Sequence, residues 1–337
     1  MKELEDLKEL LNEEDDNFNK MIEKKMNRKL STQVYKTIIS IGLVIAILLG
    51  GGHFLTKMTH YNPHKTNVEF RYLLQSYIWL YYPDVIFRPS FDNEIEDKLF
   101  GKYIYNAEFD SRFGSNYLGD NPTNIEIDNS IDLSPLHAIS PIWVNKYDRD
   151  MDYSYNNSPE SKDTLIEELN KLPESTYISA TVLFVDAIEL EEVIHMMREY
   201  KNTDFKWCAI ESFKEIQMLN TGIPLQSPSN GYGETLEGYE SLLKHYENDI
   251  PTITELQERY YDMLDVLLDD KETYNLLINR EVNRSYANLS EQRAFANEHL
   301  NSIGLKISTN KHDLIKMIQD DNCSFVWIEN MKLSKLA

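Results

Sequence analysis

The chain has 337 residues, a formal net charge of −22 and two cysteines. The acidic balance argues against nucleic-acid binding, because the neutralisation of phosphates needs clustered Lys and Arg. Two cysteines cannot build a disulfide scaffold.

Residues 1–36 form a short, highly charged N-terminal segment. Residues 1–16 carry two lysines and eight acids, whereas residues 17–36 carry six basic side chains and one acid. Leucines at positions 4, 7, 10 and 11 recur at helical spacing and predict an acidic amphipathic helix with one apolar stripe. Such a segment is too short to bury a core of its own. Two interpretations are open. The segment is a helix, or a pair of helices, that docks its leucines on a cytoplasmic partner. Alternatively, it is a solvated acidic tail followed by a basic cluster that only sets the membrane topology.

Residues 37–56 contain no Asp, Glu, Lys or Arg. A helix of 20 residues is ~30 Å long, which matches the hydrocarbon core of a bilayer, so this stretch is predicted to be one transmembrane helix. A buried helix of a soluble protein would be amphipathic, whereas every face here is apolar. A cleaved signal peptide would need an unusually long charged leader, and no clean small-x-small cleavage site follows.

The flanks of this stretch predict its orientation. Five basic residues lie within the preceding fifteen positions, and three, Lys57, Lys65 and Arg71, lie within the following fifteen. By the positive-inside rule the N-terminus is cytoplasmic and the C-terminal part is extracytoplasmic. Gly42, Ala46 and Gly50 lie four residues apart, a spacing that favours close helix–helix packing and hence self-association.

Residues 57–157 are predicted to form a juxtamembrane linker and a membrane-proximal region. Residues 69–82 suit a helix that packs in a core or rests at the membrane surface, and residues 102–109 and 124–133 alternate as strands do. Residues 145–162 are a polar connector. Two patterns resemble metal sites but lack essential features. Pro63 interrupts a continuous helix between His60 and His64. Asp148, Asp150 and Asp152 alternate, but the glycine and the distal glutamate of an EF-hand are missing.

Residues 158–337 show a repeated order of elements. A helix over 160–172 precedes a strand–helix–strand pattern, and the same pattern returns near the C-terminus. The predicted units are strand 176–185, helix 188–200 and strand 205–211, then strand 304–308, helix 311–319 and strand 323–329. Two such halves predict an α+β fold of the ferredoxin-like class. An insertion at about 212–303 separates them. It starts with a Gly/Pro/Ser/Asn loop over 222–233 and continues with helices near 235–246, 254–268 and 290–302.

The ferredoxin-like strand order places Cys208 and Cys323 on opposite edge strands. Three strand spacings separate them by ~14 Å, which exceeds the reach of a disulfide. We therefore expect two free, mostly buried thiols.

Catalytic motifs are absent from the sequence. It contains no G-x-S-x-G, H-E-x-x-H, phosphate-loop or C-x-x-C pattern. His195 and the Glu298-His299 pair lie on amphipathic helices, where a packed or surface histidine is the simpler interpretation. We expect no enzyme activity, no cofactor and no metal.

Four parts of the chain together resemble the membrane-bound anti-sigma factors, or sigma-factor regulators, of Gram-positive bacteria. They are the short charged N-terminal segment, the span flanked by KKMNRKLSTQVYK, and the stretches TYISATVLFVDAIELEEVIHMMREYKNTDFKWCAIES and GLKISTNKHDLIKMI. The resemblance implies that the cytoplasmic helix holds an extracytoplasmic-function sigma factor at the cell membrane and that the outer domain responds to an envelope signal.

The N-terminal segment lacks the Cys and His of zinc-type anti-sigma factors. The resemblance therefore implies that the leucine stripe anchors the sigma factor and that the acidic run meets the basic surface of the sigma factor. The predicted contacts are Leu4, Leu7, Leu10, Leu11, Glu13, Glu14, Asp15 and Asp16. The alternative is a membrane-anchored envelope protein that binds cell-wall components or exported proteins. An enzyme with a diffuse site is a third interpretation.

Overall fold

The computed structural model describes residues 2–88, 95–111, 123–133, 159–212, 221–226, 236–278 and 284–332. It consists of two compact units. Unit 1 comprises Met1–His60 with Leu99–Gly101, and unit 2 comprises Tyr61–Lys98 with Lys102–Ala337.

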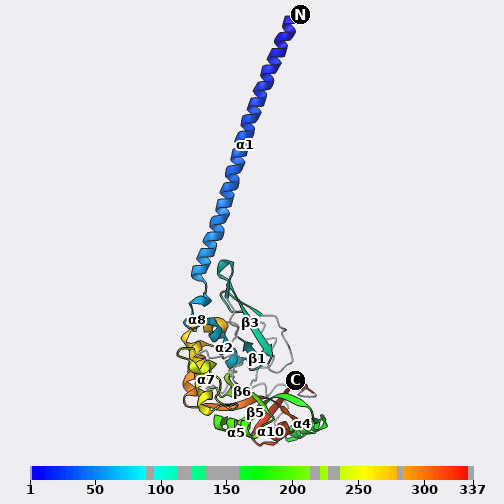
Figure 1. Cartoon of the computed structure of the whole chain (residues 1–337), viewed down its shortest axis with the longest axis vertical. Coiled ribbons are helices and arrows are strands. Elements are labelled where there is room, and N and C mark those ends of the chain that lie inside the picture. Colours follow the sequence, from blue (N-terminus) through cyan, green and yellow to red (C-terminus); the bar gives the residue numbers. More distant parts are fainter. Residues whose placement is uncertain are drawn as a thin grey trace. The chain divides into compact units, whose positions relative to one another are not determined.

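Unit 1 is dominated by helix α1, Lys2–Thr59, which runs for 58 residues without a break (Figure 1). Its large apolar side chains between Ile38 and Leu49 are half or more exposed. Among the described residues, α1 is the one helix long and apolar enough to cross a membrane. The predicted span therefore lies within a longer helix that already begins at Lys2.

Unit 2 contains two sheets and the remaining helices. Its helical elements are η1 (Pro63–Lys65), α2 (Phe70–Tyr81), α4 (Pro159–Lys171), α5 (Leu190–Glu199), α6 (Glu240–Leu243), α7 (Ile253–Asp269), α8 (Lys271–Leu277), α9 (Tyr286–Ala296) and α10 (Lys311–Gln319). Its strands are β1 (Val85–Arg88), β2 (Ile95–Asp97), β3 (Tyr103–Ser111), β4 (Thr123–Ile127), β5 (Tyr177–Glu189), β6 (Asp204–Ile210), β7 (Thr221–Pro224), β8 (Asn301–Asn310) and β9 (Cys323–Lys332).

The smaller sheet is built around β3. This strand pairs antiparallel with β1 through its second half and with β2 and β4 through its first half. Helix α2 lies against it, with the ring of Phe70 edge-on to Tyr105 at 5.4 Å between centroids. All described α2 residues except Arg71 are buried, so the core position predicted for residues 69–82 is confirmed and the membrane-surface position is wrong.

The larger sheet has the strand order β7-β6-β8-β5-β9, and all neighbouring strands are antiparallel. Helices α5 and α10 cover one face of this sheet, and α4 packs on α10 (Figure 1). Side chains of α2, the small sheet and the larger sheet belong to one hydrophobic cluster. The mixed helix and strand character predicted for the outer part is confirmed.

Strand β7 lies where the sequence suggested only a Gly/Pro/Ser/Asn loop. A Cβ on Gly222 would stand 2.0 Å from the indole of Trp207, so only glycine lets β7 approach β6 this closely. As a result, β6 is flanked on both sides and Cys208 is not on an edge strand. Cys208 and Cys323 are nevertheless free and buried, as predicted.

Two helices of the insertion differ from prediction. The helix expected over 290–302 ends at Ala296, and residues 301–302 already pair with β5 and β6. Strand pairing overrides the helical pattern there. The helix expected over 235–246 is reduced to α6. Arg259 donates to the carbonyl of Ser241 within α6 and to that of Lys244 just after it.

A buried lysine joins the two sheets. Lys306 on β8 has a side chain that is 1% exposed, and its Nζ lies 2.5 Å from Asp84 Oδ1 and 2.9 Å from Glu329 Oε1. Asp84 lies just before β1, and Glu329 on β9 also accepts a hydrogen bond from Thr181 Oγ1 at 2.5 Å. Burial raises the pKa of Glu329, while the opposing charge of Lys306 partly offsets that effect. The lysine therefore compensates two carboxylates withdrawn from water.

We expect Lys306→Met to lower the free energy of unfolding by about 3–5 kcal/mol, because it leaves two buried carboxylates without their cation. Urea unfolding of the full-length protein in detergent, followed by tryptophan fluorescence, measures the change. Lys332→Met is the matched control, because Lys332 is exposed at the end of β9. Equal stability of the two variants would show that the lysine makes no net contribution.

Candidate functional site

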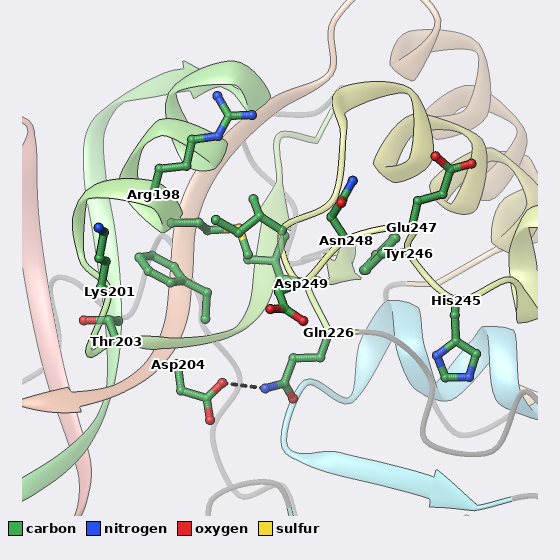
Figure 2. A pocket seen from close by; sticks show the side chains of 14 residues that line it. Arg198, Lys201, Thr203, Asp204, Gln226, His245, Tyr246, Glu247, Asn248 and Asp249 are labelled. Atoms are coloured by element: carbon green, nitrogen blue, oxygen red, sulfur yellow. Dashed lines mark hydrogen bonds between the residues drawn. The ribbon is translucent and has the colours of Figure 1, made fainter.

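A groove of about 860 Å³ opens between the end of α5, the start of β6, the end of β7 and the segment 245–250 (Figure 2). Its apolar lining comes from both sides of the groove. These side chains are Met197, Phe205, Leu225, Tyr246 and Ile250. The groove thus combines an apolar lining with a polar margin, the usual composition of a binding site.

The two walls of the groove carry different charges. Arg198 and Lys201 come from the end of α5, whereas Glu247 and Asp249 come from the opposite wall (Figure 2). Asp204, at the start of β6, accepts a hydrogen bond from Gln226 Nε2 at 2.5 Å and forms an ion pair with Lys206. A ligand in this groove would therefore meet cationic and anionic groups at different places.

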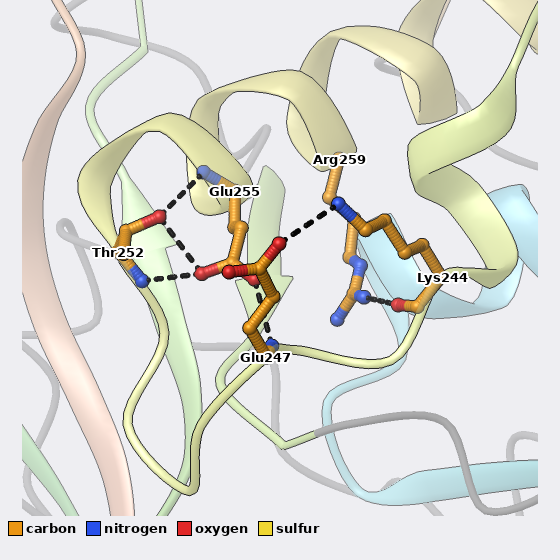
Figure 3. A network of polar contacts seen from close by, with 5 residues as sticks. All are labelled: Lys244, Glu247, Thr252, Glu255 and Arg259. Atoms are coloured by element: carbon orange, nitrogen blue, oxygen red, sulfur yellow. Dashed lines mark hydrogen bonds and ion pairs between the residues drawn. The ribbon is translucent and has the colours of Figure 1, made fainter.

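The wall formed by residues 245–250 is fixed by the N-terminus of α7 (Figure 3). Thr252 caps this helix by accepting from Glu255 N–H at 3.2 Å, and Glu255 in turn accepts from Thr252 N–H at 2.7 Å. The other carboxylate oxygen of Glu255 accepts from Glu247 N–H at 2.9 Å. Although partial burial acts in the opposite direction, these hydrogen bonds lower the pKa of Glu255. One carboxylate thus caps the helix and holds the groove wall.

Arg259 supports the same wall from behind. Its side chain is 1% exposed and donates to the carbonyls of Ser241 and Lys244. Its guanidinium lies 3.9 Å from the centroid of the Tyr246 ring, and Tyr246 Oη donates to Pro224 O at 2.7 Å. This packing links α7, the irregular segment and β7, so the wall is built before any ligand binds.

The opposite end of α7 contacts the residues that follow α1 in the chain. Asn67 donates from its backbone N–H to Asp270 at 3.2 Å and from its side chain to Asp269 O at 2.9 Å. Tyr61 Oη lies 2.7 Å from Thr273 Oγ1, and this contact is buried. We call these contacts the juxtamembrane clasp. Helix α7, ~25 Å long, therefore runs from the groove wall to the clasp.

The predicted site residues do not contribute to the groove. The leucines and acids of positions 4–16 lie on α1, and their side chains are outside the described part of the chain. Gly42, Ala46 and Gly50 also lie on α1, and a Cβ on Gly42 or Gly50 would meet no atom within 4 Å. Asp148, Asp150 and Asp152 lie outside the described residues. His195 is a surface residue, with a 77% exposed side chain 4.0 Å from Glu199.

The groove is lined by apolar and charged side chains that a ligand could contact. In the parts of the chain that the structure describes, no group of three or more His, Cys, Asp or Glu is arranged to hold a metal ion. The only local sequence signal for this site is the capping box Thr252-x-x-Glu255. The remaining lining residues come together through long-range packing, which local patterns do not reveal.

Comparison with known proteins links part of the chain to a protein family. Residues 169–305 match a family model described as the sigma factor regulator C-terminal domain. This match covers β5, α5, β6, β7, the helices of the insertion and the first half of β8. No curated protein and no solved structure matches the chain.

We expect Glu255→Ala to speed amide hydrogen exchange across residues 245–255 and to lower the free energy of unfolding by about 1 kcal/mol, because it removes half of the capping box. Exchange measured by mass spectrometry on the full-length protein tests this. Glu258→Ala is the control, since Glu258 is exposed one turn further along α7. If both variants exchange at the wild-type rate in this segment, Glu255 does not hold the wall.

Proposed function

Because residues 169–305 belong to the sigma factor regulator C-terminal family, we propose that this chain is a membrane-bound anti-sigma factor that sequesters an extracytoplasmic-function sigma factor and responds to an envelope signal. One observation supports this proposal most directly. The regulator domain shares a chain with α1, the one helix among the described residues that is long and apolar enough to cross a membrane. The function is regulatory binding rather than catalysis.

The proposed topology places the N-terminus in the cytoplasm and unit 2 outside. The excess of Lys and Arg before residue 37 supports this orientation. In that arrangement the cytoplasmic part of α1 is the only segment that reaches the sigma factor. Its leucine stripe supplies apolar anchors, and Glu13, Glu14, Asp15 and Asp16 face the basic surface of the partner.

The proposed outer sensor is the ferredoxin-like part of unit 2 with its insertion. The strand order β6-β8-β5-β9, with α5 and α10 on one face, supports that fold assignment. The groove beside α7 receives the signal, and α7 connects this groove with the juxtamembrane clasp. A ligand that moves the 245–250 wall would therefore displace the residues of the juxtamembrane clasp, which follow α1 in the chain.

We expect Leu7→Glu to weaken sigma-factor binding about tenfold or more, because it puts a charge in place of an apolar anchor. The measurement is the amount of sigma factor that co-purifies with the full-length protein from membranes, identified by mass spectrometry. Asn12→Glu is the control: it adds the same charge, and helical geometry places it ~140° away from Leu7 around α1.

Sequestration predicts that sigma factor remains bound to the Asn12→Glu protein and is lost from the Leu7→Glu protein. The proposal is wrong if no sigma factor co-purifies with the wild-type protein. If both variants retain it equally, the leucine stripe is not the binding surface.

A further inference from the structure

The turn η2, Leu99–Gly101, is an exposed apolar feature of unit 1. The side chain of Leu99 is 68% exposed and that of Phe100 is 39% exposed. In the described residues outside α1, the other large apolar side chains exposed to this degree are Val185 and Met331. Two adjacent exposed apolar residues at the tip of a turn are unusual for a surface in water.

The backbone of this turn is held in a strained conformation. Phe100 has φ 63° and ψ 38°, the left-handed region that non-glycine residues seldom adopt. Gly101 follows with φ +70°, and a Cβ at that position would stand 3.1 Å from Thr56 O and from His60 Cβ. Such strain persists only when surrounding contacts impose it.

Those contacts come from the C-terminal end of the apolar stretch of α1. Phe100 N–H donates to His53 Nδ1 at 2.9 Å, and the two rings are edge-on with centroids 6.4 Å apart. A Cβ on Gly52 would lie 3.7 Å from Phe100 Cε1. Gly52 and His53 belong to the uncharged stretch 37–56. With α1 spanning the membrane as in the proposed function, on which this inference rests, the turn lies where that stretch leaves the hydrocarbon core.

We propose that Leu99 and Phe100 insert into the lipid interface beside α1, so that this turn is a second membrane contact of the protein. Aromatic and aliphatic side chains are favoured at this depth. Lys102 follows the turn and is exposed, while Lys98 before it is paired with Glu96 at 2.6 Å. A lysine beside an apolar insertion favours lipid headgroups with negative charge. The ligand class is therefore phospholipid.

The test uses full-length protein reconstituted in vesicles of equal parts phosphatidylcholine and phosphatidylglycerol. Leu99→Cys is labelled with an environment-sensitive NBD iodoacetamide. The native cysteines do not compete, because both are buried and burial raises the pKa of the Cys208 thiol to about 12 and that of Cys323 to about 11. Val185→Cys is the control, since Val185 is an equally apolar, 50% exposed residue on β5.

We expect nitroxide lipids labelled near the headgroup to quench NBD at position 99 roughly twofold or more, and aqueous iodide to quench it weakly. NBD at position 185 should show the reverse. The proposal is overturned if iodide quenches both positions equally, because the turn then lies in water. Equal lipid quenching at both positions also overturns it, because the contact would not be specific to this turn.

Discussion

The buried ion cluster of Lys306, Asp84 and Glu329 is the constraint on which unit 2 depends. Asp84 comes from the segment between α2 and β1, whereas Lys306 and Glu329 come from strands of the larger sheet. Removal of one partner would leave an uncompensated charge in the interior, which is more costly than any exposed pair. The cluster therefore ties the segment just before β1 to the larger sheet.

This constraint has a consequence for signalling. Because the two sheets share one hydrophobic cluster and one ion cluster, they are poorly suited to move against each other. The irregular segment 245–250 is held by hydrogen bonds from Glu247 N–H to Glu255 and from Tyr246 Oη to Pro224 O, and by the guanidinium of Arg259 against the Tyr246 ring. If unit 2 responds to a ligand, the segment 245–250 is the part of the groove best suited to move, whereas the buried side chains of α7 belong to the shared hydrophobic cluster.

The sequence was most informative where periodicity and chemistry are local. The charge-free stretch before Lys57, the helix over 160–172 and the strand–helix–strand repeats all appear as regular elements in the structure. Strand β7 was not predicted because Gly222 and Pro224 resemble loop residues, and only their contact with Trp207 and Cys208 makes them a strand. The groove was missed for a similar reason, since its lining comes from four separate segments. The ion cluster joins residues more than 200 positions apart, which no local pattern reveals.

The proposed account requires that α1 separates a cytoplasmic sigma-binding segment from an outer regulator unit. The most direct test is labelling of single introduced cysteines in intact cells with a membrane-impermeant maleimide. Lys20→Cys and Val185→Cys are suitable sites, because both native residues are exposed and the native thiols are buried. The account predicts that only position 185 is labelled in intact cells and that both are labelled after permeabilisation. Labelling of position 20 in intact cells, or protection of position 185, would contradict it.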